Sequence, residues 1–277
     1  MEFAPVIKSD VARALAEDIG SGDVTASLVP KNQAGHAHVV TREAAVLCGC
    51  AWFDEVFRQI DSETRVNWRA KDGDRVSPNQ MLCEIDGRAR SLLTGERTAL
   101  NFLQTLSGVS TRTRTFVDAV AGTKATILDT RKTLPGLRRA LKYAVRCGGA
   151  SNHRMGLYDG VLIKENHIAA AGGIGTALRQ ASQVAGNLPI QIEVESIAEL
   201  KAAIEAGAKL ILLDNFDLAG LREAVRVTAR RAALEASGGV NLDTVRSIAE
   251  TGVDRISVGS LTKDVHAVDL SMRFAST

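Results

Sequence analysis

Residues 189–214, PIQIEVESIAELKAAIEAGAKLILLD, contain the pattern that decides the fold. They begin with a short apolar run at 189–195 and continue at 197–208 with an alanine-rich stretch whose apolar residues recur at helical spacing. A second apolar run follows at 209–214, after Gly207, which stands where a glycine commonly ends a helix. Because parallel strands need a long crossover between them, this stretch predicts a strand–helix–strand unit.

The same alternation extends in both directions from this unit. Amphipathic or alanine-rich stretches separate short β-rich runs, and apolar runs such as 210–213 suit strands that are covered on both faces. The pattern predicts a parallel α/β sheet of six strands. The six runs lie at 125–130, 160–164, 189–195, 209–214, 232–237 and 255–260.

Nearly every one of these runs ends in polar residues or glycine. A charged side chain inside a parallel barrel is costly unless it faces a ligand or a partner. A doubly wound sheet binds ligands at one switch point, whereas polar residues at the carboxyl ends of all strands are typical of a barrel active site. We therefore expect an incomplete, six-strand α/β barrel. The residues that end the runs are Arg131, Lys132, Lys164, Glu193, Glu195, Asp214, Ser237, Gly238, Gly239, Gly259 and Ser260.

The first third of the chain has a different pattern. A helix is expected at 10–17, and a long one at 91–120, where leucines recur at three- and four-residue spacing. Aspartate-glycine steps between short alternating runs are hairpin signals. Strand-like runs are expected at 36–40, 65–70 and 80–85, with turns at 71–74 and at Asp86-Gly87.

A chain of 277 residues is long enough for two domains. The change of pattern predicts an α/β domain at 1–110 and the barrel at 111–263, with the tail 264–277 packing back on the first domain. Hydrophobic residues make up 45% and charged residues 24%, which excludes a disordered chain.

The net charge of +2 argues against a nucleic acid or an anionic membrane as partner. The charge is uneven, however. Residues 129–167 hold eight basic and three acidic side chains, a net charge of +5, so the rest of the chain carries −3. We call residues 129–167 the basic island.

The basic island contains side chains of two kinds. Arg138, Lys142 and Arg146 fall at helical spacing, and we expect them mostly on a solvated helix face. Arg131 and Lys132 stand at a strand end, and Lys164 follows an apolar strand, so these fit a bound small polyanion better. Glu193 and Asp214 carry the opposite charge to these basic residues and could hold Mg²⁺ or sugar hydroxyls.

Two glycine-containing loops follow the last two predicted strands, SGG at 237–239 and VGS at 258–260. In barrels these loops often bind phosphate through backbone N–H groups, and glycine lets the backbone approach the oxygens. Together with the cations, they indicate a phosphorylated sugar and a carboxylated second substrate.

Targeting segments and disulfides are not expected. The start of the chain has no basic segment followed by an apolar core, and no run is long and apolar enough to span a membrane. Cys48, Cys50, Cys83 and Cys147 form no recognisable pairing pattern, which indicates reduced thiols in a cytoplasmic protein.

Long stretches of the chain resemble the quinolinate phosphoribosyltransferases, the decarboxylating nicotinate-nucleotide pyrophosphorylases of NAD biosynthesis. The resemblance runs from DIGSGDVT (18–25) to DLSMRF (269–274). It is carried by GERTALNFLQTLSGVST (95–111), LDTRKTLPGLRRALKYAVRCGGASNHRMGLYDGVLIKENH (128–167), IEVE (192–195), LLDNF (212–216), LEASGG (234–239) and GVDRISVGSLTK (252–263).

The resemblance implies an N-terminal α/β sandwich domain and a C-terminal incomplete barrel of the type II phosphoribosyltransferases. It implies a homodimer or larger assembly that acts on quinolinate and 5-phosphoribosyl 1-pyrophosphate with Mg²⁺ and no tightly bound organic cofactor. The implied products are nicotinate mononucleotide, CO₂ and pyrophosphate.

The resemblance also implies roles for individual residues. Arg131, His153, Arg154 and Lys164 match the quinolinate-binding groups, and Arg97 matches an arginine lent by the partner subunit. Lys132, Glu193 and Asp214 match the surroundings of the phosphoribosyl pyrophosphate and metal, and with Lys164 they form the implied catalytic set. The remaining implied substrate-binding residues are Thr130, Ser237, Gly238, Gly239, Val258, Gly259 and Ser260, with Glu96, Asn101 and Lys263 in a second rank.

Three alternatives remain open on the residues alone. A barrel lyase could use Lys164 as a Schiff base, although the extra arginines do not fit it. The same scaffold could also carry a non-catalytic metabolite-binding or regulatory protein. A related phosphoribosyltransferase that acts on another acid, such as the molybdenum-associated relative, is a closer alternative.

Overall fold

A computed structural model describes residues 3–275. The chain forms two compact units, which are described separately. Among the described residues, the first contains 3–114, 134–149 and 264–275, and the second contains 115–133 and 150–263.

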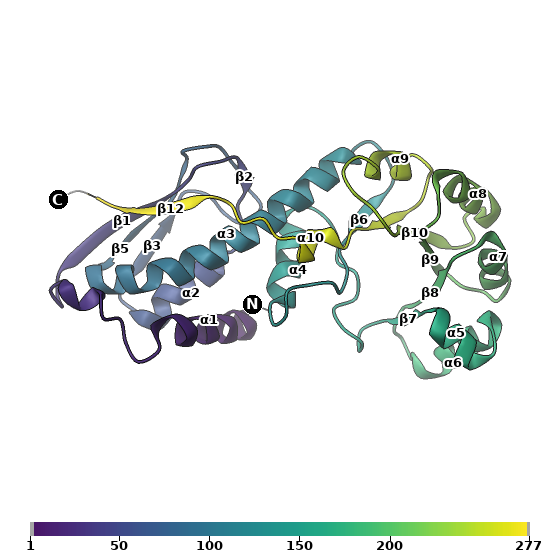
Figure 1. The fold of residues 1–277 in the computed structure, drawn as a ribbon, viewed down its shortest axis with the longest axis horizontal. Helices are drawn as coiled ribbons and strands as arrows, with labels where there is room; N and C mark the ends of the chain where they lie inside the picture. The colour runs from purple at the N-terminus through teal and green to yellow at the C-terminus, as the bar shows by residue number, and fades with distance from the viewer. Residues whose placement is uncertain (1–2, 276–277) are drawn as a thin grey trace. The chain divides into compact units, whose positions relative to one another are not determined.

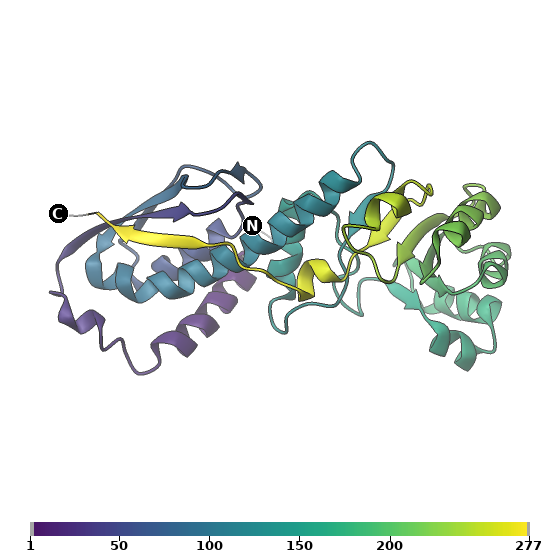
Figure 2. The same cartoon turned by 45° about the horizontal axis from the view of Figure 1, so that its top comes forward.

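The first unit is built on a four-stranded antiparallel sheet with the order β12-β1-β5-β3. The strands are β1 (Ala34–Thr41), β3 (Arg65–Trp68), β5 (Met81–Arg88) and β12 (Leu270–Phe274). β12 pairs with β1 in antiparallel register, Val39 opposite Met272, so the last strand of the chain lies beside the first one (Figures 1 and 2). A separate two-stranded ribbon joins β2 (Ala45–Val46) to β4 (Arg75–Val76).

Helices cover this sheet. They are α1 (Ala4–Ile19), α2 (Cys50–Ile60) and α3 (Ala89–Ala119), with a short 3₁₀ turn at Ala26–Leu28. The largest fully buried side chains, Trp52, Phe53 and Phe57, lie on one face of α2, and Phe53 stacks edge-on against both Phe57 and Trp68. This aromatic cluster is part of the core of the first unit, beside buried aliphatic side chains such as Leu82 and Ile85.

The predicted turn at Asp86-Gly87 is wrong. Both residues lie inside β5 and pair with β1, Asp86 opposite His36 and Gly87 opposite Gly35. Gly87 serves close packing instead, because a Cβ there would lie 2.8 Å from the Thr64 hydroxyl. The predicted helix at 91–120 is confirmed as α3, which has 31 residues, and the predicted helix at 10–17 is part of the longer α1.

The second unit holds all six predicted parallel strands, in the order β6-β11-β10-β9-β8-β7. Because β6 and β7 stand at opposite edges, the sheet is an incomplete barrel, as predicted. Helices lie outside the strands (Figure 1). The strands are β6 (Thr126–Leu128), β7 (Val161–Ile163), β8 (Ile190–Val194), β9 (Leu210–Asp214), β10 (Ala233–Ser237) and β11 (Arg255–Ser257). The helices are α5 (Glu165–Ala171), α6 (Ile174–Val184), α7 (Ile197–Glu205), α8 (Leu218–Thr228), α9 (Val245–Ala249) and α10 (Ser260–Lys263).

The stretch quoted first folds as β8, α7 and β9. Ser196 caps α7 by accepting a hydrogen bond from the Glu199 N–H at 3.2 Å, as serine does at helix N-termini. Gly207 follows the end of the helix with a φ of +87°, a left-handed conformation that favours glycine. Both signals mark the ends of α7. Because β8 and β9 pair in parallel, their carboxyl ends lie side by side.

Helix α4 (Arg138–Cys147) belongs to the first unit, although its neighbours in sequence belong to the second. Lys142 on this helix is fully buried, so the expectation of a solvated position is wrong for this residue. It is buried together with Leu141, Ala144 and Val145 of the same helix. Continuous domains at 1–110 and 111–263, with 264–277 as a returning tail, stay a prediction.

Within residues 3–275, no helix combines the length and the apolar character that crossing a membrane requires.

Candidate active site

A cavity of about 280 Å³ lies at the carboxyl ends of the second unit's strands. Nine of the residues predicted for the site line it together, although they come from five separate strand ends and one loop. The nine residues are Thr130, Arg131, Lys132, His153, Arg154, Lys164, Glu193, Asp214 and Ser237. Parallel strands present their carboxyl ends at one edge, so the topology accounts for this gathering.

Four basic side chains line the cavity: Arg131, Lys132, Arg154 and Lys164. The Arg154 guanidinium donates a hydrogen bond to the Gly160 carbonyl at 3.0 Å. Burial, and the neighbouring positive charge of Arg131, hold the pKa of Arg154 below its usual value. Two guanidinium groups this close repel each other, so an anion between them is favoured.

Two carboxylates end neighbouring strands, Glu193 on β8 and Asp214 on β9. Lys164 forms an ion pair with Glu193, with 2.6 Å between Nζ and Oε2. Burial raises the pKa of Asp214, and the negative charge of Glu193 adds to the shift, while Lys164 and Lys132 oppose it. A cation between the two carboxylates would relieve this repulsion.

Lys132 is held at the cavity through its backbone. Its N–H donates to the Thr130 hydroxyl at 3.1 Å, and its carbonyl accepts from the Thr262 hydroxyl at 2.7 Å. Its side chain crosses Gly259, where an added Cβ would lie 3.2 Å from Lys132 Cδ. Gly259 therefore serves the site by leaving room for the lysine.

The two predicted phosphate loops differ in structure. Gly238 and Gly239 have left-handed φ angles of +98° and +60°, and the space beside Gly239 is open. In the second loop, the Val258 N–H already donates to the Leu128 carbonyl at 2.9 Å, and the Ser260 hydroxyl oxygen is buried. Left-handed glycines thus shape the first loop, whereas Val258 ties the start of the second loop to β6.

Three of the predicted residues belong to the first unit. Arg97 is exposed on α3. Glu96 is half-buried beside it, and burial raises the pKa of this carboxyl. Asn101 lines a separate groove of the first unit, between α1 and α3. Lys263, which is exposed, ends α10 in the second unit.

The sequence reasoning missed a buried polar chain at the floor of the cavity. Gln191 on β8 donates through Nε2 to Glu235 Oε2 at 2.9 Å, and the Ser257 hydroxyl donates to Glu235 Oε1. Glu235 is fully buried on β10. A glutamate and a glutamine inside otherwise apolar strands were the signal that could have found them, because buried polar groups need partners.

This chain also sets the proton position on His153. The ring Nδ1 accepts a hydrogen bond from the Arg154 N–H at 2.7 Å, and Nε2 lies 2.9 Å from Gln191 Oε1. Because the Gln191 amide turns its nitrogen to Glu235, its oxygen faces the ring and can only accept. The geometry therefore places the proton of a neutral His153 on Nε2.

Two further residues that the sequence reasoning missed hold the site in place. Asp129, fully buried after β6, accepts hydrogen bonds from the His153 N–H at 2.8 Å and the Asn152 amide at 2.6 Å. Asn215 donates to Asp214 Oδ2 at 2.8 Å and adopts a left-handed φ of +56°. Its amide fills the place that a Cβ on Gly238 would need, so Gly238 cannot be replaced without displacing it.

Family models account for most of the chain. The model described as the quinolinate phosphoribosyl transferase N-terminal domain matches residues 23–107, and the one for the C-terminal domain matches residues 109–273. The chain belongs to the quinolinate phosphoribosyltransferase family.

Curated relatives and solved structures of this quinolinate phosphoribosyltransferase family agree. A nicotinate-nucleotide pyrophosphorylase (carboxylating) from Mycobacterium leprae is 44% identical over 274 residues, which is 96% of each chain. A probable enzyme of the same name from Bacillus subtilis is 42% identical over 92% of this chain and 89% of its own length. The structure of the nicotinate-nucleotide pyrophosphorylase from Francisella tularensis superposes with a TM-score of 0.96 at 44% identity, covering 98% of this chain and 96% of its own.

We expect Glu235→Ala to lower the free energy of unfolding of the protein by about 3 kcal/mol, because it leaves the Gln191 amide and the Ser257 hydroxyl without an acceptor and opens a cavity. Urea denaturation followed by circular dichroism measures the loss. The control is Glu223→Ala, which removes a surface ion pair with Arg226 and should cost less than about 1 kcal/mol. Equal losses in the two variants would contradict the role given to Glu235.

We expect Glu193→Gln to lower the pKa of Asp214, because it removes the like charge that raises it. Titration of the aspartate ¹³Cγ signal by NMR, assigned with Asp214→Asn, measures the change. The folded state holds the Asp214 proton more tightly than the unfolded state does, because the pKa is raised on folding. The free energy of unfolding therefore falls as the pH rises through this pKa, and Glu193→Gln should make that fall smaller. Lys164→Met should raise the pKa of Asp214, because it removes a positive charge that lowers it. A lower pKa in Lys164→Met would contradict these electrostatic roles.

Proposed function

We propose that this chain transfers the phosphoribosyl group of 5-phosphoribosyl 1-pyrophosphate to quinolinate with decarboxylation. The products would be nicotinate mononucleotide, CO₂ and pyrophosphate, a step of NAD biosynthesis. The observation that supports it most is one cavity lined by four basic side chains and by two carboxylates on neighbouring strands. The names of the relatives at 42% and 44% identity support the same reaction.

Quinolinate carries two adjacent carboxylates, which suit the basic side chains of Arg131, Arg154 and Lys164. Arg131 and Arg154 can each bind a carboxylate through two parallel hydrogen bonds, and Lys164 adds a mobile charge. A substrate carboxylate that reaches Lys164 competes with Glu193 for its ammonium group. Held in this way, the pyridine nitrogen can be oriented toward ribose C1. The Nε2–H of His153 could donate a hydrogen bond to the substrate only after breaking its hydrogen bond to Gln191.

Lys132, the two carboxylates and the loop after β10 suit the phosphoribosyl pyrophosphate. Gly238 and Gly239 offer backbone to the phosphate, and Lys132 lies beside Gly259. Glu193 and Asp214 would hold Mg²⁺ together with substrate oxygens, since this ion is commonly bound by one or two carboxylates and phosphates. Among residues 3–275, these two carboxylates are not part of a close group of three metal-binding side chains, which fits a metal that arrives with its substrate.

The cavity residues also suit the charge changes of the reaction. Departure of pyrophosphate leaves an oxocarbenium-like centre at ribose C1, which the carboxylate of Glu193 or Asp214 can stabilise, while Lys132 offsets charge on the leaving group. Bound Mg²⁺ would neutralise part of the same leaving charge. Loss of the 2-carboxylate as CO₂ then leaves an electron pair that the cationic ring nitrogen can accept, so this step requires positioning more than a dedicated base.

The Schiff-base alternative is less well supported by the geometry. Lys164 is engaged with Glu193 at 2.6 Å, an arrangement that favours its ammonium form, whereas a Schiff base requires the free amine. The paired guanidinium groups of Arg131 and Arg154 would also have no role in that chemistry. They favour an acceptor with more than one carboxylate.

We further propose a cytoplasmic homodimer in which Arg97 of each subunit completes the partner's site. Arg97 is exposed on a helix of the first unit and does not line the cavity of the second. Such a side chain could bind an anionic substrate that is held in the cavity of a second copy of the chain.

Direct assay tests the proposed reaction. Purified protein is mixed with quinolinate, 5-phosphoribosyl 1-pyrophosphate and Mg²⁺, and nicotinate mononucleotide and CO₂ are quantified. We expect both products in equal amounts, and we expect nicotinic acid to fail as acceptor because it lacks the second carboxylate. Comparable turnover of nicotinic acid would reject the two-carboxylate interpretation, and no nucleotide from quinolinate would reject the function.

Mixed dimers test the shared site. Arg97→Ala and Lys164→Ala chains should each be nearly inactive, because each spoils both sites of its own dimer. After subunit exchange at equal concentrations, about half of the dimers carry one intact site, so activity should return to about a quarter of the wild-type value. Each variant exchanged with itself is the control, and no gain on mixing would refute the shared site.

A further inference from the structure

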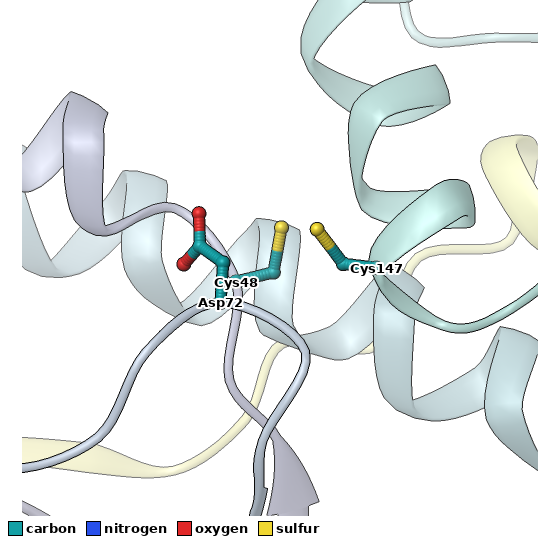
Figure 3. A group of neighbouring side chains, drawn as sticks. All are labelled: Cys48, Asp72 and Cys147. Atoms are coloured by element: carbon teal, nitrogen blue, oxygen red, sulfur yellow. The ribbon is translucent and has the colours of Figure 1, made fainter.

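A pair of thiols in the first unit lies outside the residues that the proposed reaction uses. Cys48 follows β2, and Cys147 is the last residue of α4. Their sulfur atoms and a carboxylate oxygen of Asp72 all lie within 4.8 Å of one another, and the two thiols point toward each other (Figure 3). The chain thus brings together two cysteines from distant parts of its sequence.

The surroundings of Asp72 argue against a metal ion here. One oxygen of its carboxylate accepts from the N–H groups of Gly49 at 2.9 Å and Cys50 at 3.1 Å. The other accepts from the Tyr143 hydroxyl at 2.7 Å. The carboxylate is therefore engaged in holding the start of α2 to α4, and a closed zinc site would need four ligands.

The two sulfur atoms have unequal environments. Cys48 is fully buried, and hydrogen bonds of its backbone N–H and carbonyl with the Ser107 hydroxyl fix it in place. Cys147 is half-buried and can meet solvent. The hydrogen bond from the Cys48 thiol lowers the pKa of Cys147. Burial and the negative charge of Asp72 oppose this shift, while Tyr143 and Arg146 give smaller help to it. Burial raises the pKa of Cys48, which therefore remains a donor.

We propose that Cys147 and Cys48 form a reversible oxidation site at which hydrogen peroxide converts the two thiols to a disulfide. The Cys147 thiolate attacks one peroxide oxygen, the O–O bond breaks, and the leaving hydroxide becomes water on protonation. Cys48 then attacks the sulfenic sulfur of Cys147, the S–S bond forms, and the sulfenic oxygen leaves as a second water. Two electrons pass from the thiols to the peroxide.

The other two cysteines make suitable internal references. Burial raises the pKa of both Cys50 and Cys83, and carboxylates nearby add to the shift. Since the thiolate is the reactive form, these two should resist the peroxide that oxidises Cys147. Selectivity among four cysteines of one chain is therefore the signature of the site.

Peptide mapping of the native protein tests the proposal. The protein is treated with hydrogen peroxide, remaining thiols are blocked with N-ethylmaleimide, and the chain is digested without reductant for mass spectrometry. We expect a Cys48–Cys147 cross-linked peptide at least ten times more abundant than any other disulfide, and we expect dithiothreitol to remove it. Protein unfolded in urea before oxidation should lose this preference.

Two variants sharpen the result. Cys147→Ser should abolish the cross-link, whereas the matched Cys50→Ser should leave its yield unchanged. Cys147 over-oxidised without a cross-link, a dominant disulfide between other cysteines, or four intact thiols in the native wild-type protein would each overturn the proposal. Stoichiometric zinc that survives dialysis and is lost in Cys147→Ser would also overturn it. These readings do not use enzymatic activity, so they stand apart from the proposed function.

Discussion

The buried carboxylate of Glu235 imposes the constraint on which the candidate site depends. A carboxylate inside a parallel barrel is costly unless its oxygens are paired. Gln191 from β8 and Ser257 from β11 pair them across the sheet, and His153 from the loop after β6 joins the same chain. At the floor of the cavity, these hydrogen bonds link β8 to β10, which are not neighbours in the sheet, and β10 to β11. The other carboxylates and most of the basic side chains of the cavity lie at the carboxyl ends of strands in the same sheet.

The hydrogen bonds of this floor also have a direction. Glu235 can only accept in its carboxylate form, so the Gln191 amide must turn its nitrogen inward and its oxygen toward His153. The ring proton position then follows, and with it the orientation of the loop that carries Arg154. One charged group in the barrel thus determines the arrangement of polar atoms at the wall where an acceptor acid would bind.

Much of the second unit could be predicted from the sequence, because its signals are local. Six apolar runs, each ended by polar residues, indicated the strands and the edge at which they meet, and nine predicted residues line the cavity. Gln191, Glu235 and Asp129 were missed because their importance lies in partners that are distant in sequence. In the first unit, Asp86-Gly87 looked like a hairpin turn, but its pairing with Gly35 and His36 shows that strand pairing overrides turn propensity.

The basic island shows how far a charge count along the chain can mislead. Its middle part is α4, which belongs to the first unit and buries Lys142. Arg131, Lys132, Arg154 and Lys164 alone bring the charge of the island to the cavity of the second unit, where Glu193, Asp214 and Glu235 line it too. The cavity is therefore not a uniformly positive surface but a set of opposed charges fixed at different strand ends. Such an arrangement can orient a ligand that carries carboxylates at one end and a developing positive charge at the other, which a simple cationic patch cannot do.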